Sequence, residues 1–256
     1  MPYLPDKAGD QRIENAAGHS YRQGFFIGDG TGVGKGREAA ACIMDQWCRG
    51  RHRHAWIRLN GPLLQDVRRD WSALGGLDID IQPLDAIPLD EPIGMSAGIL
   101  FLTYSALRSV RDQGVSRLDQ ILAWLGEEFD GVIVLDESHS LANAAPAASE
   151  FGDAVASQQG IAGLRLQNAL PRARILYVSA TGATRPANLG YAARLGLWGE
   201  GSAFAQCSEA GIPRWFRQTC SQLRMLCDPP PAPPPPPVPP APGHGGANTD
   251  FDELMG

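Results

Sequence analysis

Residues 28–37 constrain the fold of this chain more than any other stretch. They read Gly-Asp-Gly-Thr-Gly-Val-Gly-Lys-Gly-Arg and directly follow the apolar run 25–27. Alternating glycines let the backbone wrap closely around a ligand with its N–H groups pointing inward, and a helix that follows adds free N–H groups and a positive dipole end. Lys35 then places a compact ammonium where the β- and γ-phosphates of a nucleotide would lie. The order of strand, glycine loop and helix therefore predicts a phosphate-binding loop rather than a flexible glycine-rich turn.

The lysine of this loop stands out from the composition, because the chain has 20 arginines and only two lysines, Lys7 and Lys35. Two positions depart from the usual phosphate-loop pattern. Asp29 replaces the first glycine, and Gly36 replaces the Ser or Thr whose hydroxyl normally contacts Mg²⁺. A water or another side chain would have to take over that contact. The residues expected to hold the nucleotide are Asp29, Gly30, Thr31, Gly32, Val33, Gly34, Lys35, Gly36 and Arg37.

Composition limits the class of protein. With 256 residues and 43% apolar side chains, the chain can bury one substantial core. A net charge of −6 argues against a wholly basic nucleic-acid coat but permits a local basic strip. The five cysteines form no C-x-x-C pair, which disfavours a disulfide framework and a zinc site. Without an apolar run long enough to cross a membrane or a signal pattern, we expect a soluble, intracellular protein of the cytoplasm.

Strand and helix patterns alternate along the chain. Continuous apolar runs predict strands at 25–27, 55–59, 98–104, 131–135 and 175–178, and a short one at 79–81. Helical spacing predicts helices at 37–48, 62–71, 118–125 and 163–170, and a short one at 10–17. Strands that alternate with helices imply an α/β fold with a parallel sheet and right-handed crossovers.

The same patterns divide the chain into four segments. A lead-in at 1–23 precedes the main domain at 24–204, and 205–228 could hold one or two helices. The last segment, 229–256, is rich in proline, with eleven of the 21 prolines at 229–242. Such a tract cannot bury a core, so we expect a disordered polyproline tail. The alternative is that this tail is a ligand for a proline-binding module.

Two acids follow a second buried strand. The sequence Asp136-Glu137-Ser138-His139 comes directly after the apolar run 132–135, at the strand end where open parallel sheets bind ligands. Beside a phosphate loop, Asp136 would hold Mg²⁺ through water and Glu137 would orient and deprotonate the attacking water. The run Ser179-Ala180-Thr181 ends a third strand with small hydroxyl residues.

The phosphate loop, the Asp-Glu-x-His run and the Ser-Ala-Thr run together resemble the first RecA-like domain of a superfamily-two helicase or translocase of the DExH type. The residues at 28–37, 178–183 and 194–198 resemble the strawberry notch family. The resemblance implies that Gly-Arg after the lysine is a feature of that family. This resemblance covers about residues 21–204. It implies a RecA-like P-loop NTPase domain that binds ATP and Mg²⁺ and acts on nucleic acid, either DNA or RNA.

The resemblance also implies roles for particular residues. Lys35 and the loop glycines would bind ATP phosphates, while Asp136 and Glu137 would serve the metal and hydrolysis. The residues that would couple the nucleotide to nucleic acid are His139, Ser179 and Thr181. The candidates for contact with a nucleic-acid backbone are Asn60, Thr103 and Tyr104, with Arg68, Arg69 and the cluster Arg49, Arg51 and Arg53 as phosphate contacts. For the arginines, a solvated face is an equal alternative.

Two parts of the family pattern are missing from the sequence. Neither Gln11 nor Gln23 stands in a convincing adenine-reading segment, and no second RecA-like domain follows. We therefore expect a truncated or split copy that hydrolyses ATP weakly alone and depends on a second RecA-like domain or a full-length homologue in trans. In a homo-oligomer, Arg185 or Arg194 would be the first candidates for the missing arginine. The alternatives are a non-hydrolysing nucleotide-binding scaffold or a transcription-related interaction protein, and, less favoured, a small-molecule kinase.

Overall fold

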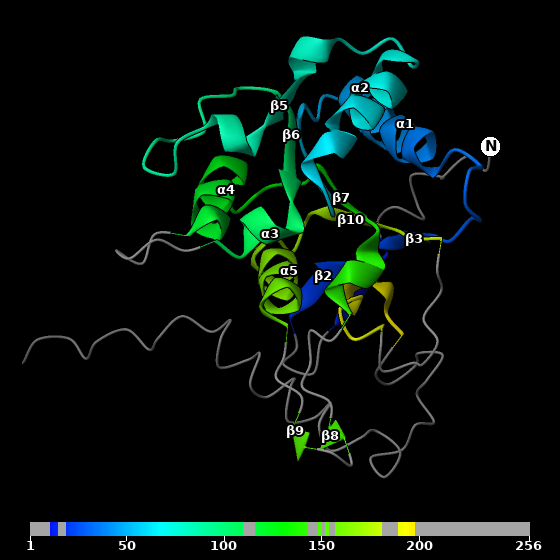
Figure 1. Cartoon of the computed structure of the whole chain (residues 1–256), viewed down its shortest axis with the longest axis vertical. Helices are drawn as coiled ribbons and strands as arrows, with labels where there is room; N and C mark the ends of the chain where they lie inside the picture. Colours follow the sequence, from blue (N-terminus) through cyan, green and yellow to red (C-terminus); the bar gives the residue numbers. More distant parts are fainter. Residues whose placement is uncertain are drawn as a thin grey trace, which may run out of the picture.

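The structure, a computed structural model, describes residues 11–14, 19–109, 116–142, 148–149, 152–153, 157–180 and 189–197. Within them six strands form one parallel sheet in the order β3-β10-β7-β4-β6-β5 (Figure 1). The strands are β3 (Phe25–Ile27), β4 (Arg53–Arg58), β5 (Ile81–Pro83), β6 (Gly98–Thr103), β7 (Val132–Asp136) and β10 (Arg174–Val178). This sheet confirms the predicted α/β fold, whereas the segments predicted at 205–228 and 229–256 lie outside the described residues.

The central strand β7 is buried on both faces of the sheet. Ile133 and Leu135 belong to the core on one face, and Val132 and Val134 to the core on the other. All five residues of β7 and all six of β6 are buried. A parallel strand covered on both sides requires apolar residues at every position, which explains the continuous runs in the sequence.

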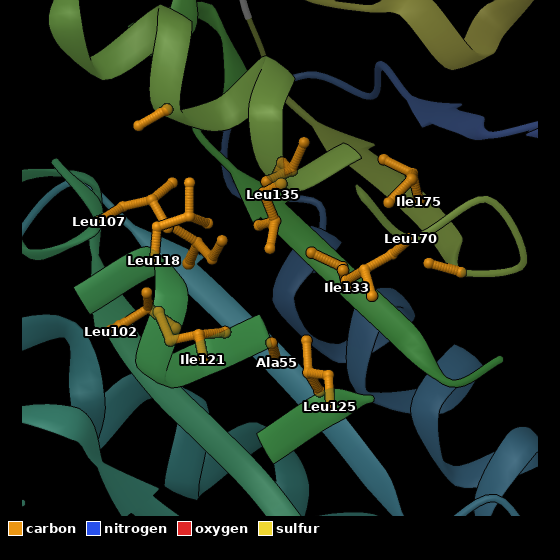
Figure 2. Packing of buried hydrophobic residues seen from close by; sticks show 14 of the residues in the cluster. Ala55, Leu102, Leu107, Leu118, Ile121, Leu125, Ile133, Leu135, Leu170 and Ile175 are labelled. Carbon is orange, nitrogen blue, oxygen red and sulfur yellow. The ribbon is translucent and has the colours of Figure 1, made fainter. Parts of the chain in front are cut away.

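Helices cover the two faces of the sheet. They are α1 (Lys35–Cys48), α2 (Leu64–Ser72), α3 (Tyr104–Leu107), α4 (Arg117–Leu125) and α5 (Gln158–Ala169). The first two bury Ile43 and Val67 against one face, and the other three pack against the opposite face. Figure 2 shows the second of these cores, where Leu118 of α4 lies close to Leu107 of α3 and Ile121 of α4 close to Leu102 of β6.

The remaining described elements are short. Single 3₁₀ turns are η2 (Gly61–Leu63), η3 (Asp78–Asp80), η4 (Leu84–Ala86), η5 (Ser138–Leu141) and η7 (Ala193–Leu195). Two small antiparallel ladders pair β1 (Arg12–Glu14) with β2 (Ser20–Arg22), and β8 (Ala148–Ser149) with β9 (Gly152–Asp153).

Two sequence expectations need correction. The helix predicted at 10–17 is wrong, because residues 12–14 form strand β1 and pair with β2. An isolated helix of that length is marginal in water, whereas the ladder satisfies the backbone groups with partners. The strand predicted at 79–81 begins only at Ile81, since the carboxylate of Asp80 accepts from the N–H of Leu77 (2.9 Å) and from Trp71 Nε1 (2.9 Å) and closes a 3₁₀ turn first.

A buried histidine makes the fold sensitive to acid. His54 of β4 is fully buried, and its Nδ1 accepts from the N–H of Val132 (3.1 Å) while its Nε2 donates to the carbonyl of Arg51 (2.7 Å). Both bonds suit the neutral ring, because a proton on Nδ1 would face another N–H. Burial lowers the pKa of His54 to about 4, from an ordinary value of 6.5.

We predict that His54 costs the fold stability as the pH falls. Above about pH 6.5 the ring is neutral in both the folded and the unfolded chain, and the fold keeps its full stability. Below this pH the unfolded chain takes up the proton first, because the pKa of His54 is lowered to about 4 in the folded chain. The free energy of unfolding therefore declines between about pH 6.5 and 4 by roughly 3 kcal/mol. Urea unfolding across this range should show the decline in the wild type and a flatter profile in His54→Asn. His52→Asn, at the exposed neighbouring histidine, should retain the wild-type profile. A wild-type slope in His54→Asn would contradict the assignment.

Candidate functional site

The glycine loop lies at the carboxyl end of β3, and residues 28–34 are exposed. Gly32 and Gly34 have φ of 83° and 102°, in the left-handed region that favours glycine. Gly34 caps α1 without a side-chain hydrogen bond, so the first N–H groups of the helix are open to an anion. The structure therefore places a helix N-terminus and a glycine loop together, as the sequence predicts.

Lys35 points into this loop. Its Nζ donates to the carbonyls of Asp29 (3.0 Å) and Gly30 (2.8 Å). Phosphate oxygens are stronger, charged acceptors and could replace these carbonyls without moving the lysine backbone. Burial and the neighbouring carboxylate of Asp29 raise the pKa of Glu38, one turn into α1. The loop thus places one ammonium near two acids, Asp29 and Glu38.

Asp136 ends β7 and is almost completely buried, at 4% exposure. Its Oδ2 lies 2.8 Å from Arg58 Nε and accepts from Trp56 Nε1 (3.3 Å), and its Oδ1 accepts from the N–H of Glu137 (3.0 Å). The Arg58 Nε–H is not aligned for a hydrogen bond, so this contact is an ion pair. Both partners come from β4, the strand next to β7, because parallel strands end at the same edge of the sheet.

The burial of Asp136 governs its electrostatics. Desolvation raises the pKa of this carboxyl, and the attraction of Arg58 and the Trp56 hydrogen bond offset only part of that effect. A buried carboxylate that is incompletely compensated gains free energy from a divalent cation. The chemistry of this side chain therefore fits a divalent metal ion.

Glu137 is the only non-glycine residue with a positive φ among the described residues, at φ 52° and ψ 48°. Such a conformation costs free energy and is concentrated at functional sites. Its carboxylate lies 3.4 Å from His139 Nδ1, which is in turn 3.0 Å from Ser179 Oγ. The N–H of Ser179 donates to the carbonyl of Ile27 at the end of β3 (3.1 Å). The acid motif is thus connected through Ser179 to the strand that carries the glycine loop.

The candidates for nucleic-acid contact separate into two groups. Thr103 caps α3 by accepting from the N–H of Ala106 (3.2 Å), and it lines a polar hollow of about 500 Å³ with Ser105 and Arg108. Tyr104, by contrast, is fully buried and its hydroxyl donates to the carbonyl of Asp136 (2.9 Å). The prediction that Tyr104 touches nucleic acid is wrong for its side chain, which instead supports the end of β7.

The arginine candidates are also divided. Asn60 is exposed in the loop after β4, and Arg69 of α2 is exposed but pairs with Asp66 (3.0 Å), whereas Arg68 is half-buried. Arg51 lies at the opposite, amino edge of the sheet and pairs with Asp130 (2.7 Å). Two further arginines there are occupied by Asp45 and by the Trp124 carbonyl, namely Arg49 and Arg53. A cavity of about 590 Å³ at that edge is lined by residues 50–53 and 125–131, away from the glycine loop.

Arg194 is a structural residue and not a candidate arginine for a neighbouring site. It is 1% exposed, and its guanidinium donates to four carbonyls, those of Arg22, Gln167, Leu170 and Pro171, at 2.6–3.2 Å. It also lies 4.6 Å from the centre of the Tyr21 ring. Thr181 and Arg185 lie outside the described residues. The amide of Gln23 donates to the carbonyl of Leu195 (3.2 Å), so this side chain is engaged within the fold.

Comparison with known proteins gives the family of the chain. Residues 4–215 match the family model described as P-loop containing NTP hydrolase pore-1. The chain belongs to this family. Within the P-loop NTP hydrolase pore-1 family it is similar to the strawberry notch proteins, which confirms the resemblance drawn from its motifs.

Three relatives give the scale of this similarity. FORGETTER 1 of Arabidopsis thaliana is 42% identical over 72% of this chain, strawberry notch homolog 1 of Gallus gallus 40% over 78%, and strawberry notch homolog 2 of Homo sapiens 44% over 73%. The chain spans only 14%, 16% and 13% of these relatives. A Sulfolobus solfataricus SWI2/SNF2 ATPase core solved with dsDNA superposes with a TM-score of 0.48 at 16% identity, covering 80% of this chain and 38% of that one. No helix in the described ranges is long and apolar enough to span a membrane.

We predict that Asp136→Asn stabilises the fold. Because burial raises the pKa of Asp136, its ionised form is disfavoured in the folded chain, and stability is lost as the pH rises through the folded pKa. The neutral amide should raise the melting temperature at pH 7, and the gain should shrink in acid. Asp66→Asn, at a partly exposed carboxylate, should show no such gain. A lower melting temperature in Asp136→Asn would mean that the Arg58 pair outweighs desolvation.

Proposed function

We propose that this chain is the ATP-binding domain of a DExH-type motor that acts on nucleic acid, with Mg²⁺ as its metal. The observation that carries the proposal is the placement of the glycine loop and Asp136 at one edge of the sheet: the loop with Lys35 follows β3, Asp136 ends β7, and both strands flank β10. One group is an ammonium suited to phosphate and the other a buried carboxylate suited to the metal. The chain matches only a small part of its relatives, so motor activity is a proposal about the protein to which this domain contributes.

The link from Glu137 through His139 to Ser179 supports the DExH assignment. In this proposal Asp136 holds the metal through water, Glu137 orients and deprotonates the attacking water, and His139 and Ser179 transmit the state of the nucleotide. Bound ATP with Mg²⁺ would supply the transferable phosphoryl group and the charge that polarises it. The chain's own residues position the phosphates, hold the base and connect it to β3.

The polar hollow beside Thr103 supports contact with a nucleic-acid backbone. It lies at the carboxyl end of β6, on the same edge of the sheet as the loop, and its lining carries two arginines, Arg108 and Arg117, against one carboxylate, Asp85. Hydroxyl groups and arginines are the usual partners of phosphate oxygens. A non-hydrolysing nucleotide-binding scaffold is the alternative function, and it keeps the loop without requiring this hollow.

Lys35→Ala should weaken nucleotide binding. Loss of a charge-assisted contact worth roughly 1.5–3 kcal/mol corresponds to about tenfold or more in Kd, measured by titration of a fluorescent ATP analogue with Mg²⁺. Lys7→Ala removes the only other lysine and should leave the affinity unchanged. Equal affinity in the wild type and Lys35→Ala would refute the phosphate loop.

Glu137→Gln should bind the ATP analogue as the wild type does and lose turnover, because it changes the base and leaves the loop intact. Turnover is measured with and without single-stranded and duplex nucleic acid, and with an added second RecA-like domain, since an arginine from such a domain contributes roughly 10³–10⁵ in rate. Nucleic-acid-stimulated turnover in the wild type supports the motor. Nucleotide binding without turnover under all these conditions supports the scaffold, and loss of binding in Glu137→Gln would refute the role of the base.

Arg108→Ala should weaken binding to a fluorescent oligonucleotide and reduce the slope of log K against log salt by about 1, as expected for one phosphate contact. The control is Arg172→Ala, because Arg172 is a half-exposed arginine at the opposite edge of the sheet, where it pairs with Glu128. An unchanged salt slope in Arg108→Ala would remove the hollow from the interface.

A further inference from the structure

The glycine loop lacks one oxygen that a phosphate loop normally offers to the metal. The residue after the lysine is usually Ser or Thr, and its hydroxyl contacts Mg²⁺. In this chain that residue is Gly36, the second residue of α1, which has no side chain to contribute. Another group must therefore supply an oxygen near position 36.

Asp70 of α2 occupies the space that a side chain at position 36 would take. A Cβ built on Gly36 would stand 3.4 Å from Asp70 Cγ and would overlap Asp70 Oδ2 outright. Helices α1 and α2 lie side by side, which brings the two residues together (Figure 1). Gly36 does not have a positive φ, so its backbone conformation does not require glycine. A side chain at this position would instead have to displace the carboxylate of Asp70.

The two oxygens of Asp70 face different surroundings. Oδ1 pairs with Arg37 Nη2 (3.7 Å) and Arg69 Nε (3.5 Å), while Oδ2 is the oxygen that faces Gly36. The residue is 8% exposed, so its carboxylate is held in place and not free in solvent. One oxygen is thus anchored by arginines, and the other is directed at the start of α1 beside the phosphate loop.

Asp70 and Asp136 also belong to one network of charges. Arg58 pairs with Asp136 (2.8 Å) and approaches Asp66 (4.0 Å), and Arg69 pairs with Asp66 (3.0 Å) and Asp70 (3.5 Å). No group of three or more His, Cys, Asp or Glu side chains converges in the described part of the chain. Mg²⁺ in nucleotide sites is held by one or two carboxylates together with substrate phosphates and waters.

We propose that Asp70 replaces the missing hydroxyl of the phosphate loop, so that a carboxylate from α2 gives the Mg²⁺ shell the oxygen that the residue after Lys35 usually gives. The inference rests on the proposed nucleotide function and deepens it. It predicts an unusually strong dependence of nucleotide affinity on Mg²⁺. With the cation, Asp70 is an additional oxygen ligand; without it, the same negative charge repels the phosphates.

The test compares the Kd of a fluorescent ADP analogue in Mg²⁺ and in EDTA. The ratio of the two constants should fall by about tenfold in Asp70→Asn, through weaker binding with Mg²⁺ and tighter binding in EDTA, because a neutral amide is a poorer ligand and does not repel phosphate. Asp66→Asn is the matched control: Asp66 lies one turn away on α2 and joins the same network, but does not face Gly36. It should keep the wild-type ratio.

A second variant pair tests the steric half of the proposal. Gly36→Ser alone should lower the melting temperature and the affinity, because its Cβ overlaps Asp70. Gly36→Ser combined with Asp70→Ala removes the overlap and restores the usual hydroxyl, so it should recover the melting temperature and at least part of the Mg²⁺ dependence that Asp70→Ala loses. Mn²⁺ with ADP, followed by electron paramagnetic resonance, should report a changed metal environment in Asp70→Asn.

The outcomes separate this inference from the proposed function. A wild-type Mg²⁺ ratio in Asp70→Asn, with nucleotide binding intact and still sensitive to Lys35→Ala, would overturn the role of Asp70 and leave the function standing. A lower melting temperature with an unchanged ratio would make Asp70 a purely structural partner of Arg37, which also overturns the proposal. A wild-type chain that binds no nucleotide in either buffer would overturn both.

Discussion

The burial of β7 on both faces determines the geometry of the whole functional edge. Because helices cover each side of the sheet, β7 must be apolar until its last residue, and Asp136 is the first position at which the strand can carry charge. Its neighbours β4 and β10 run parallel, so Arg58, Ser179 and Asp136 are delivered to the same edge. The chemistry of the site is therefore a consequence of where the apolar strands end.

The chain places two charges in buried positions and stabilises them differently. Arg194 donates to four backbone carbonyls and stacks near Tyr21; burial lowers its pKa only to about 10, so it remains charged at neutral pH. Asp136 has an ion pair and two hydrogen bonds, and desolvation still dominates its pKa. The guanidinium of Arg194 is held by its four carbonyls although its Nε has no hydrogen-bond partner among the described residues, and it stays charged. The charged form of Asp136 is the one that burial disfavours, so this carboxylate would gain free energy from a bound cation.

The sequence predicted the strands and the loop because those features are local. Apolar runs and glycine spacing do not depend on distant residues, and β3, β6, β7 and β10 were all found within a residue or two of their positions. Side-chain direction could not be predicted in the same way. Tyr104 follows a strand end, as a nucleic-acid contact would, but only the packing of α3 shows that its ring turns inward.

The surroundings of the arginines could not be predicted from the sequence for the same reason. Arg51 and Arg194 look identical to any solvated arginine in the sequence, yet one pairs with Asp130, which is distant in the sequence, and the other lies inside a cage of carbonyls. Whether the basic cluster at 49–53 lies near the glycine loop depends on which edge of the sheet holds the start of β4. Open parallel sheets bind ligands at the carboxyl ends of their strands, whereas this cluster lies at the amino end of β4. The same rule singles out Arg58, which is the last residue of β4.

The departure at Gly36 shows how a local irregularity can record a tertiary contact. The sequence revealed that a hydroxyl was missing, but α2 had to be placed against α1 before the neighbouring carboxylate could be seen. Two arginines, Arg37 and Arg69, pair with this carboxylate. A guanidinium keeps its proton near neutral pH, so Arg37, Arg58 and Arg69 supply fixed positive charge beside the carboxylates on α2 and β7. The two kinds of cation therefore have different surroundings in this chain: guanidinium groups pair with the acids Asp70 and Asp136, and the ammonium of Lys35 bonds to loop carbonyls, which phosphate oxygens would replace in the proposed nucleotide complex.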